Sequence, residues 1–201
     1  MGSHRIRKIT ISSTIITTIA GIGVSAYSGD GGQATAAAIQ YPHGVNLDSA
    51  ANVYFGDYHN GCNVIRKITV STGIITTVAG TGNSTGGYNG DNIQATAAML
   101  SSPHDVVLDS FDNLYICDRK NYRIRKVDAA TGVITTVVGT GTASSTGDGA
   151  AATSATISQT CYIRFDGAGN YYISECGSSR IRKVTTVSTE IPTSAPSMTP
   201  R

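Results

Sequence analysis

The sequence Arg-Ile-Arg-Lys at residues 123–126 returns along the chain at a nearly constant interval. The same four residues stand at 5–8 and 180–183, and Val-Ile-Arg-Lys stands at 64–67. The second arginine of the group recurs after 59, 59 and 57 residues, as Arg7, Arg66, Arg125 and Arg182. A fixed period of this length indicates a repeat architecture in which each period supplies one supersecondary unit.

Each period contains four short segments with the composition of β-strands. In the third copy a basic segment, Arg123–Val127, is followed by a Thr-Gly turn and a β-branched run at 133–139. In the second copy a Gly- and Asp-rich loop leads to an alternating segment, 106–109, then to a turn ending in Asn and a fourth segment, 114–118. β-Branched residues, apolar alternation and turn signals favour strands over helices. Gly and Thr argue against a helical turn even in the most Ala-rich stretches, which are 34–39, 95–100 and 150–156.

Four-stranded antiparallel sheets repeated around an axis form a β-propeller. We therefore predict an all-β fold, a β-propeller built of four-stranded antiparallel blades, and rank a solenoid of parallel coils below it. The blades are expected at residues 5–186, with repeat phases near 5–63, 64–122 and 123–179 and a partial phase at 180–186. Residues 1–4 are interpreted as a tag or N-terminal remnant, and 187–201 as a Pro/Ser/Thr-rich tail.

The pattern Pro-His-Gly-Val-Asn-Leu-Asp, continued by Asn-Val-Tyr-Phe-Gly-Asp and Val-Ile-Arg-Lys within residues 42–67, resembles the NHL repeat. The copy at 103–126 resembles it more closely, and the resemblance extends from residue 5 to about 186. It implies the blades of a β-propeller, most often six, used chiefly for binding and not for a reaction. The third copy departs from the pattern, since Thr160-Cys161 replaces Pro-His and Glu175 replaces the Asp at the strand end.

The number of strands is unusual for a propeller. With the strands of a blade lettered a to d, the chain starts with c and d, continues through two complete blades, and ends with a, b and c. These thirteen expected strands form about three blades, whereas propellers use roughly 4–8. Because open sheet edges pair with other chains, we expect another chain to complete the blades, in a closed dimer or a filament, unless the chain is a fragment of a longer propeller. The expected joining residues are Thr14, Ile15, Ile16, Thr17, Thr18, Ile19, Arg180, Ile181, Arg182, Lys183 and Val184.

The four cysteines show no CxxC spacing, so a structural zinc site is not expected. Cys161 falls opposite Cys176 when the strands of the third hairpin pair across their turn. Residues opposite each other on paired strands reach the Cα separation of a disulfide, about 4.4–6.8 Å. We predict a Cys161–Cys176 disulfide, and thiols at Cys62 and Cys117 unless the blades bring those two together.

Charge and composition limit the partners and the location of the chain. Only 14% of residues are charged and the net charge is +2, so no strong field attracts nucleic acid or an anionic membrane. No run of about 18 apolar residues and no signal peptide is visible. The sequon Asn83-Ser84-Thr85 predicts N-glycosylation, and the tail has the composition of a stalk or a disordered end. Together with the predicted disulfide, these features favour an extracellular protein.

Two histidines and three carboxylates occupy equivalent positions near the predicted central channel. His43 and His104 begin the alternating strands, and Asp57, Asp118 and Glu175 end the strands that follow. Such groups could hold a divalent ion, and some six-bladed relatives are metal-dependent hydrolases or lyases, which gives an enzymatic alternative. A residue repeated in every blade is more often structural, because catalysis requires groups in different environments.

Repeated acidic and basic residues have a second set of interpretations. One Asp per loop is expected to bond its own backbone in a tight turn, with calcium as a minor alternative. An arginine ladder along the basic strands gives a further alternative, binding of RNA or a polyanionic glycan, although compensating acidic residues argue against it. The loop residues are Asp30, Asp91 and Asp148, and the ladder residues are Arg7, Arg66, Arg125 and Arg182.

The sequence as a whole favours a non-enzymatic NHL-repeat binding or structural scaffold that self-associates through its edge strands. We expect no cofactor and no catalytic residue. The expected partners are further copies of the chain and a protein or glycan ligand, with no membrane partner and no nucleic acid.

Overall fold

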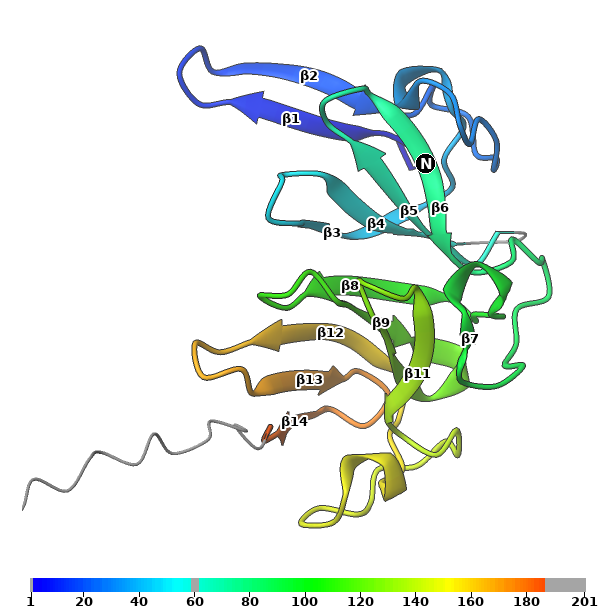
Figure 1. The fold of residues 1–201 in the computed structure, drawn as a ribbon, viewed down its shortest axis with the longest axis vertical. Coiled ribbons are helices and arrows are strands. Elements are labelled where there is room, and N and C mark those ends of the chain that lie inside the picture. Colours follow the sequence, from blue (N-terminus) through cyan, green and yellow to red (C-terminus); the bar gives the residue numbers. More distant parts are fainter. Residues whose placement is uncertain (1, 59–61, 187–201) are drawn as a thin grey trace, which may run out of the picture.

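A computed structural model describes residues 2–58 and 62–186, which form strands, turns and four single-turn helices (Figure 1). The strands are β1 (Ile6–Thr10), β2 (Ile15–Ala20), β3 (Pro42–Leu47), β4 (Val53–Asp57), β5 (Val64–Thr69), β6 (Ile74–Ala79), β7 (Ile93–Gln94), β8 (Pro103–Leu108), β9 (Leu114–Asp118), β10 (Arg123–Val127), β11 (Val133–Val138), β12 (Thr160–Phe165), β13 (Tyr171–Glu175) and β14 (Arg180–Val184). No helix among these residues has the length and apolarity needed to cross a membrane.

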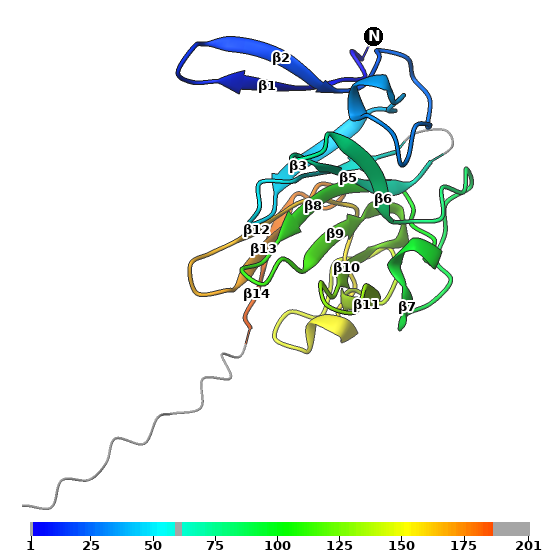
Figure 2. The same cartoon turned by 45° about the horizontal axis from the view of Figure 1, so that its top comes forward.

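The strands form four antiparallel sheets in chain order. We call β1–β2 the N-terminal hairpin, β3–β6 the second blade, β8–β11 the third blade and β12–β14 the last blade. The inner strands β3, β8 and β12 lie next to one another, and each blade extends outward from its inner strand, as in a propeller (Figures 1 and 2). The predicted all-β propeller architecture is confirmed, and the short strand β7, which pairs with the outer edge of β11, is an addition that the pattern did not predict.

The repeated Asn at the first hairpin turn of each blade joins two turns. Asn113 donates from its backbone and its side chain to Asp109, at 3.0 and 2.8 Å. Its side-chain oxygen accepts the backbone N–H of Ala129, in the turn between β10 and β11, at 2.9 Å. Asn52 and Asn170 make the same contacts in their own blades. The Asp–Asn pair therefore fixes the hairpin geometry through side-chain bonds to the backbone.

Apolar residues on both faces of the third blade form the interblade cores. Ile116 and Ile134 pack toward Ile65 of the second blade, while Ile124 packs toward Ile163 of the last blade. All five side chains are fully buried, and each contributes about 1.5–3 kcal/mol relative to an exposed position. Burial of both faces is what makes one blade depend on its neighbours.

The Ala-rich stretches differ from the prediction, because each contains one turn of 3₁₀-helix. These are η1 (Ala34–Ala36), η2 (Ala95–Ala97) and η4 (Ala152–Ser154), and a fourth turn, η3 (Arg119–Asn121), follows β9. Ala34 and Ala95 are buried. The first residue of each of η1, η2 and η4 accepts a backbone hydrogen bond from the Gly that directly follows β2, β6 or β11. These glycines, Gly21, Gly80 and Gly139, have φ between 92° and 96°, a conformation that favours glycine.

Candidate functional site

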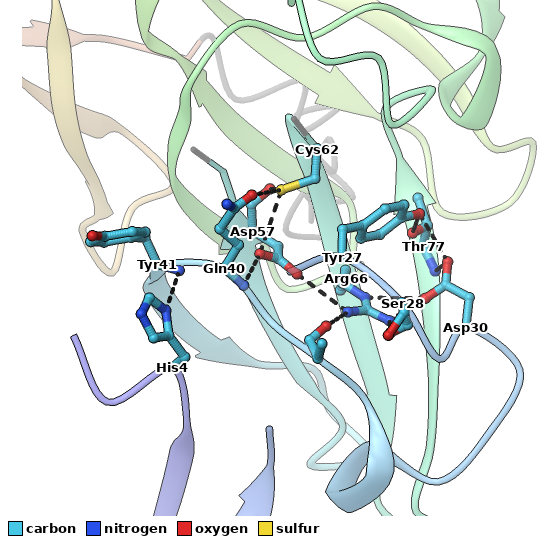
Figure 3. A network of polar contacts seen from close by, with 11 residues as sticks. His4, Tyr27, Ser28, Asp30, Gln40, Tyr41, Asp57, Cys62, Arg66 and Thr77 are labelled. Carbon is cyan, nitrogen blue, oxygen red and sulfur yellow. Dashed lines mark hydrogen bonds and ion pairs between the residues drawn. The ribbon is translucent and has the colours of Figure 1, made fainter. Parts of the chain in front are cut away.

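An arginine held between two carboxylates recurs in the second, third and last blades, and we call each instance an arginine clamp. The arginine is buried in the second and third blades and partly buried in the last. Figure 3 shows the clamp of the second blade, in which Arg66 lies between the loop before β3 and the end of β4. Its Nη2 lies 2.6 Å from Asp30 Oδ1, and its Nη1 lies 3.3 Å from Asp57 Oδ2. The guanidinium also donates to the carbonyl oxygens of Ala38 and Ser28 at 3.0 Å. The planar fork of arginine suits this convergence of acceptors.

The other two clamps join Arg125 to Asp91 (2.9 Å) and Asp118 (3.5 Å), and Arg182 to Asp148 (2.6 Å) and Glu175 (3.2 Å). In the second and third blades the pairing register shifts immediately before the arginine, between Ile65 and Arg66 and between Ile124 and Arg125. A β-bulge re-aims the following side chain. The same shift stands between Ile6 and the exposed Arg7, so the bulge by itself does not bury the arginine. Arg66 and Arg125 are enclosed by carboxylates from the preceding loop and from the end of the neighbouring strand.

The clamps correct two predictions about charged residues. The prediction that Asp30, Asp91 and Asp148 bond their own backbone is corrected, because each is paired with the arginine on the third strand of the blade that follows it. Arg66 and Arg125 are 0% exposed. They cannot take part in a surface ladder for RNA or a polyanionic glycan, so this alternative loses two of its four arginines.

Burial controls the ionisation of the inner carboxylates. Desolvation raises the pKa of Asp57 to about 6, and the same effect raises the pKa of Asp118 to about 6. Hydrogen bonds from neighbouring groups and the charges of Arg66 and Arg125 act in the opposite direction. Both carboxylates are therefore ionised at neutral pH and become protonated in mildly acidic solution.

Arg7, the equivalent arginine of the N-terminal hairpin, is exposed and forms no ion pair within residues 2–58 and 62–186. The expected joining strands, β2 and β14, lie in different sheets. β2 pairs with β1 on one edge and β14 pairs with β13 on one edge, and their other edges have no strand partner in the described part of the chain. The structure thus leaves the predicted joint open and does not bring its two strands together.

The two ends of the stack expose residues that are buried at equivalent positions inside it. Ile16 of the N-terminal hairpin is 53% exposed, whereas its equivalent Ile75 is 0% exposed. Ile181 of the last blade is 77% exposed, whereas its equivalents Ile65 and Ile124 are 0% exposed. Single exposed apolar residues are common on protein surfaces, but here the exposed residues occupy positions that are buried in the other blades. Both ends therefore resemble blade faces that no neighbouring blade covers.

The two predicted histidines come together at the start of the inner strands. The rings of His43 and His104 have centroids 4.6 Å apart, and the ring of Tyr58 lies 5.1 Å from that of His43. Desolvation lowers the pKa of both histidines, and the charge of Arg119 lowers it further. The pair is therefore neutral at pH 7, the form that binds metal.

Two histidines alone make an incomplete metal site. Nδ1 of His104 lies 3.0 Å from the carbonyl oxygen of Cys161, which engages one of its two ring nitrogens. Within the part of the chain that the structure describes, no group of three or more His, Cys, Asp or Glu residues is placed to hold a metal. Asp57 and Asp118, which were predicted to converge on the channel with the histidines, instead belong to arginine clamps.

The predicted disulfide is present in the last blade, where Cys161 and Cys176 are bonded with a Cα–Cα distance of 5.9 Å. Cys62 and Cys117 are buried thiols outside any disulfide, and the sulfur of Cys62 lies 3.1 Å from the carbonyl oxygen of Asp57. Asn83 is exposed in the loop after β6, where its side-chain oxygen accepts from Thr85 at 3.1 Å. The sequon is thus accessible, and its glycosylation stays a prediction.

Solved structures share this fold. A protein of unknown function from Bacteroides thetaiotaomicron superposes with a TM-score of 0.70 at 23% identity, over 90% of this chain and 42% of that one. An auxiliary nutrient binding protein from the same organism gives a TM-score of 0.62 at 18% identity, with the same two coverages. A gluconolactonase-like protein, described as putative in its source, gives 0.58 at 10% identity over 92% of this chain and 53% of that one. The chain thus spans about half the length of these structures.

No curated protein matches the sequence significantly. The sequence model of one family, described as the Teneurin NHL domain, matches residues 22–200. This match covers the second, third and last blades, with their arginine clamps and Asp–Asn turns. The chain therefore belongs to the Teneurin NHL domain family.

Proposed function

We propose that the chain is a non-enzymatic NHL-repeat scaffold that binds partners and self-associates through its open edges. The observation that carries this proposal is the exposure of repeated core positions at both ends, with Ile181 77% exposed where Ile65 and Ile124 are 0% exposed. Apolar area of this kind is removed from water when a further blade packs on it. Open edges of β2 and β14 add unsatisfied backbone groups that another strand would pair.

The location in this proposal is extracellular. A disulfide in the last blade and an exposed sequon support it, because disulfides persist in oxidising compartments and N-glycans are added there. The non-enzymatic character is supported by the clamps, which use the repeated carboxylates for structure. In such a scaffold the bound partner is a further copy of the chain, and a protein or glycan ligand is a second kind of partner.

The native mass in solution tests this proposal. Light scattering after size exclusion, with negative-stain images of the same sample, should give a discrete multiple of the 20.8 kDa of one chain or extended filaments. A compact monomer that stays monomeric at high concentration and unfolds cooperatively would contradict self-association.

A further inference from the structure

β1 and β14 are two versions of the same strand. Both carry Arg-Ile-Arg-Lys, at residues 5–8 and 180–183. In the complete third blade, the equivalent strand β10 pairs with β9 on its inner edge and with β11 on its outer edge. β1 makes only the outer pairing, with β2, and β14 makes only the inner pairing, with β13. Each incomplete sheet therefore holds the part of a blade that the other does not.

We propose that two copies of the chain close a ring in which the N-terminal hairpin of one copy completes the last blade of its partner. β1 takes the place of β14 against β13, so that β12 and β13 of one copy and β1 and β2 of the other form one shared blade. This inference rests on the proposed self-association and specifies its geometry. Each copy then supplies two whole blades and half of two shared ones. Two such copies form six blades, a number within the roughly 4–8 that propellers contain.

The arginine clamp fixes the register of the exchange. Within the last blade, Arg182 lies opposite Ile173, and Ile181 lies opposite Ser174. When β1 replaces β14 in the same register, Arg7 lies opposite Ile173 and Ile6 lies opposite Ser174. Arg7 then reaches the two carboxylates that now contact Arg182, those of Glu175 and Asp148.

In the shared ring, the last blade of one copy contacts the second blade of its partner through the same repeat positions that join the third and last blades within one chain. Tyr115 of the third blade packs on Phe165 and Tyr171 of the last blade, with ring centroids 5.0 and 5.5 Å apart. Its equivalent in the last blade is Tyr172, which is exposed. The equivalents of Phe165 and Tyr171 in the second blade are Leu47 and Val53.

Leu47 and Val53 line an apolar groove of about 480 Å³ between the N-terminal hairpin and the second blade. Leu47 is 53% exposed in this groove. The shared blade places β12 and β13 of the partner over the groove, so Tyr172 enters it as Tyr115 enters its own interface. The groove therefore occupies the repeat position of an interface that the third and last blades already show.

The strand that moves is β14, because β1 keeps its pairing with β2 while Arg7 remakes the ion pairs that Arg182 leaves. Ile6 is 6% exposed in the core that includes Ala20 and Ile39. His4, just before β1, is buried and accepts the backbone N–H of Tyr41 at 3.3 Å. Ile181 of β14 is exposed. Replacing β14 by β1 also exchanges one backbone ladder for an equivalent one, whereas joining β2 to β14 would release the anchored β1.

Cysteine trapping distinguishes these arrangements. Ile6→Cys and Ser174→Cys are prepared as separate variants of the full chain and mixed under mild oxidation. The shared blade predicts a covalent dimer in the mixture and none in either variant alone. The matched pair Thr17→Cys and Lys183→Cys, which the register of Lys126 and Thr135 in the third blade makes opposite, should stay uncrosslinked. A link through this second pair would show β2 joined to β14 and would overturn the exchange.

A charge test avoids the buried site of Ile6. Arg7→Ala should raise the dimer dissociation constant on the order of 100-fold, because it leaves two carboxylates unpaired in the joint. Arg182→Ala should lower that constant, because it weakens the clamp that β14 leaves in the exchange. A dimer that depends on Arg182 and not on Arg7, or a filament, would overturn the exchange while leaving self-association standing. A monomer without either link would overturn both proposals.

Discussion

Replacing Arg125 by alanine should lower the free energy of unfolding by more than the removal of any surface charge does. The guanidinium is 0% exposed and lies 2.9 Å from Asp91 and 3.5 Å from Asp118, whose side chain is also 0% exposed. Removing one partner of a buried ion pair leaves the other charge desolvated and costs about 3–5 kcal/mol. For a chain of this size, that loss lowers Tm by roughly 6–20 °C.

The pH dependence of the loss identifies its cause. Asp118 has a pKa of about 6 with Arg125 present, because burial opposes its ionisation. At pH 7 the Arg125→Ala variant must either bury an uncompensated carboxylate or protonate it, and both are unfavourable. At pH 5 the carboxyl is already largely protonated, so the loss should be smaller than at pH 7.

Urea unfolding at pH 5 and pH 7, followed by circular dichroism, measures both quantities. The control is Lys120→Ala, which removes the same charge from an exposed position of the same blade and should change the free energy of unfolding by less than about 0.5 kcal/mol. A loss for Arg125→Ala no larger than that of the control, or an equal loss at both pH values, would refute the clamp as a buried electrostatic element.

Two further predictions concern the same inner carboxylates and the last blade. The pKa of Asp118 is raised from 3.8 to about 6 in the folded state, so the wild type loses stability as pH rises through this window. Asp118→Asn has no such group, so its free energy of unfolding relative to wild type should increase by up to about 3 kcal/mol between pH 4 and 6. A difference that does not change with pH would contradict the burial argument. The Cys161–Cys176 disulfide closes a 15-residue separation, so Cys161→Ala with Cys176→Ala should lose about 3 kcal/mol. Reductant should destabilise the wild type by the same amount and leave the double variant unaffected. If reductant destabilised both proteins equally, the loss could not be assigned to this disulfide.

The positions of the strands follow from local sequence, and so does the disulfide. The β-branched run at 133–138 forms β11 as predicted, and the Asp and Asn at 109 and 113 close the hairpin between β8 and β9. Cys161 and Cys176 are bonded as predicted, but they are not directly opposite each other, because Thr160 pairs with Glu175 and the register shifts between Thr160 and Tyr162. These features involve residues close in the chain, so a pattern with a period of two and a turn signal is enough to predict them.

The arginine clamps could not be predicted from the strand pattern. Alternation predicts which face of the strand Arg66 occupies, but the carboxylates that enclose it come from the loop before β3 and from the end of β4. Its partner Asp30 lies 36 residues away and in a different loop. The one available signal was that one Asp per loop and one Arg per basic strand recur with the same period.

The repeat, the strands, the turns and the grouping of strands into blades can be predicted from the amino-acid sequence, because each depends on contacts within about one period. Which residues face solvent can be seen only in the folded chain. Ile65 and Ile181 occupy the same position in the same motif, yet one is covered by a neighbouring blade and the other is 77% exposed. Burial depends on what packs against a blade. A local pattern that repeats identically in every blade cannot predict whether a neighbouring blade covers a given residue.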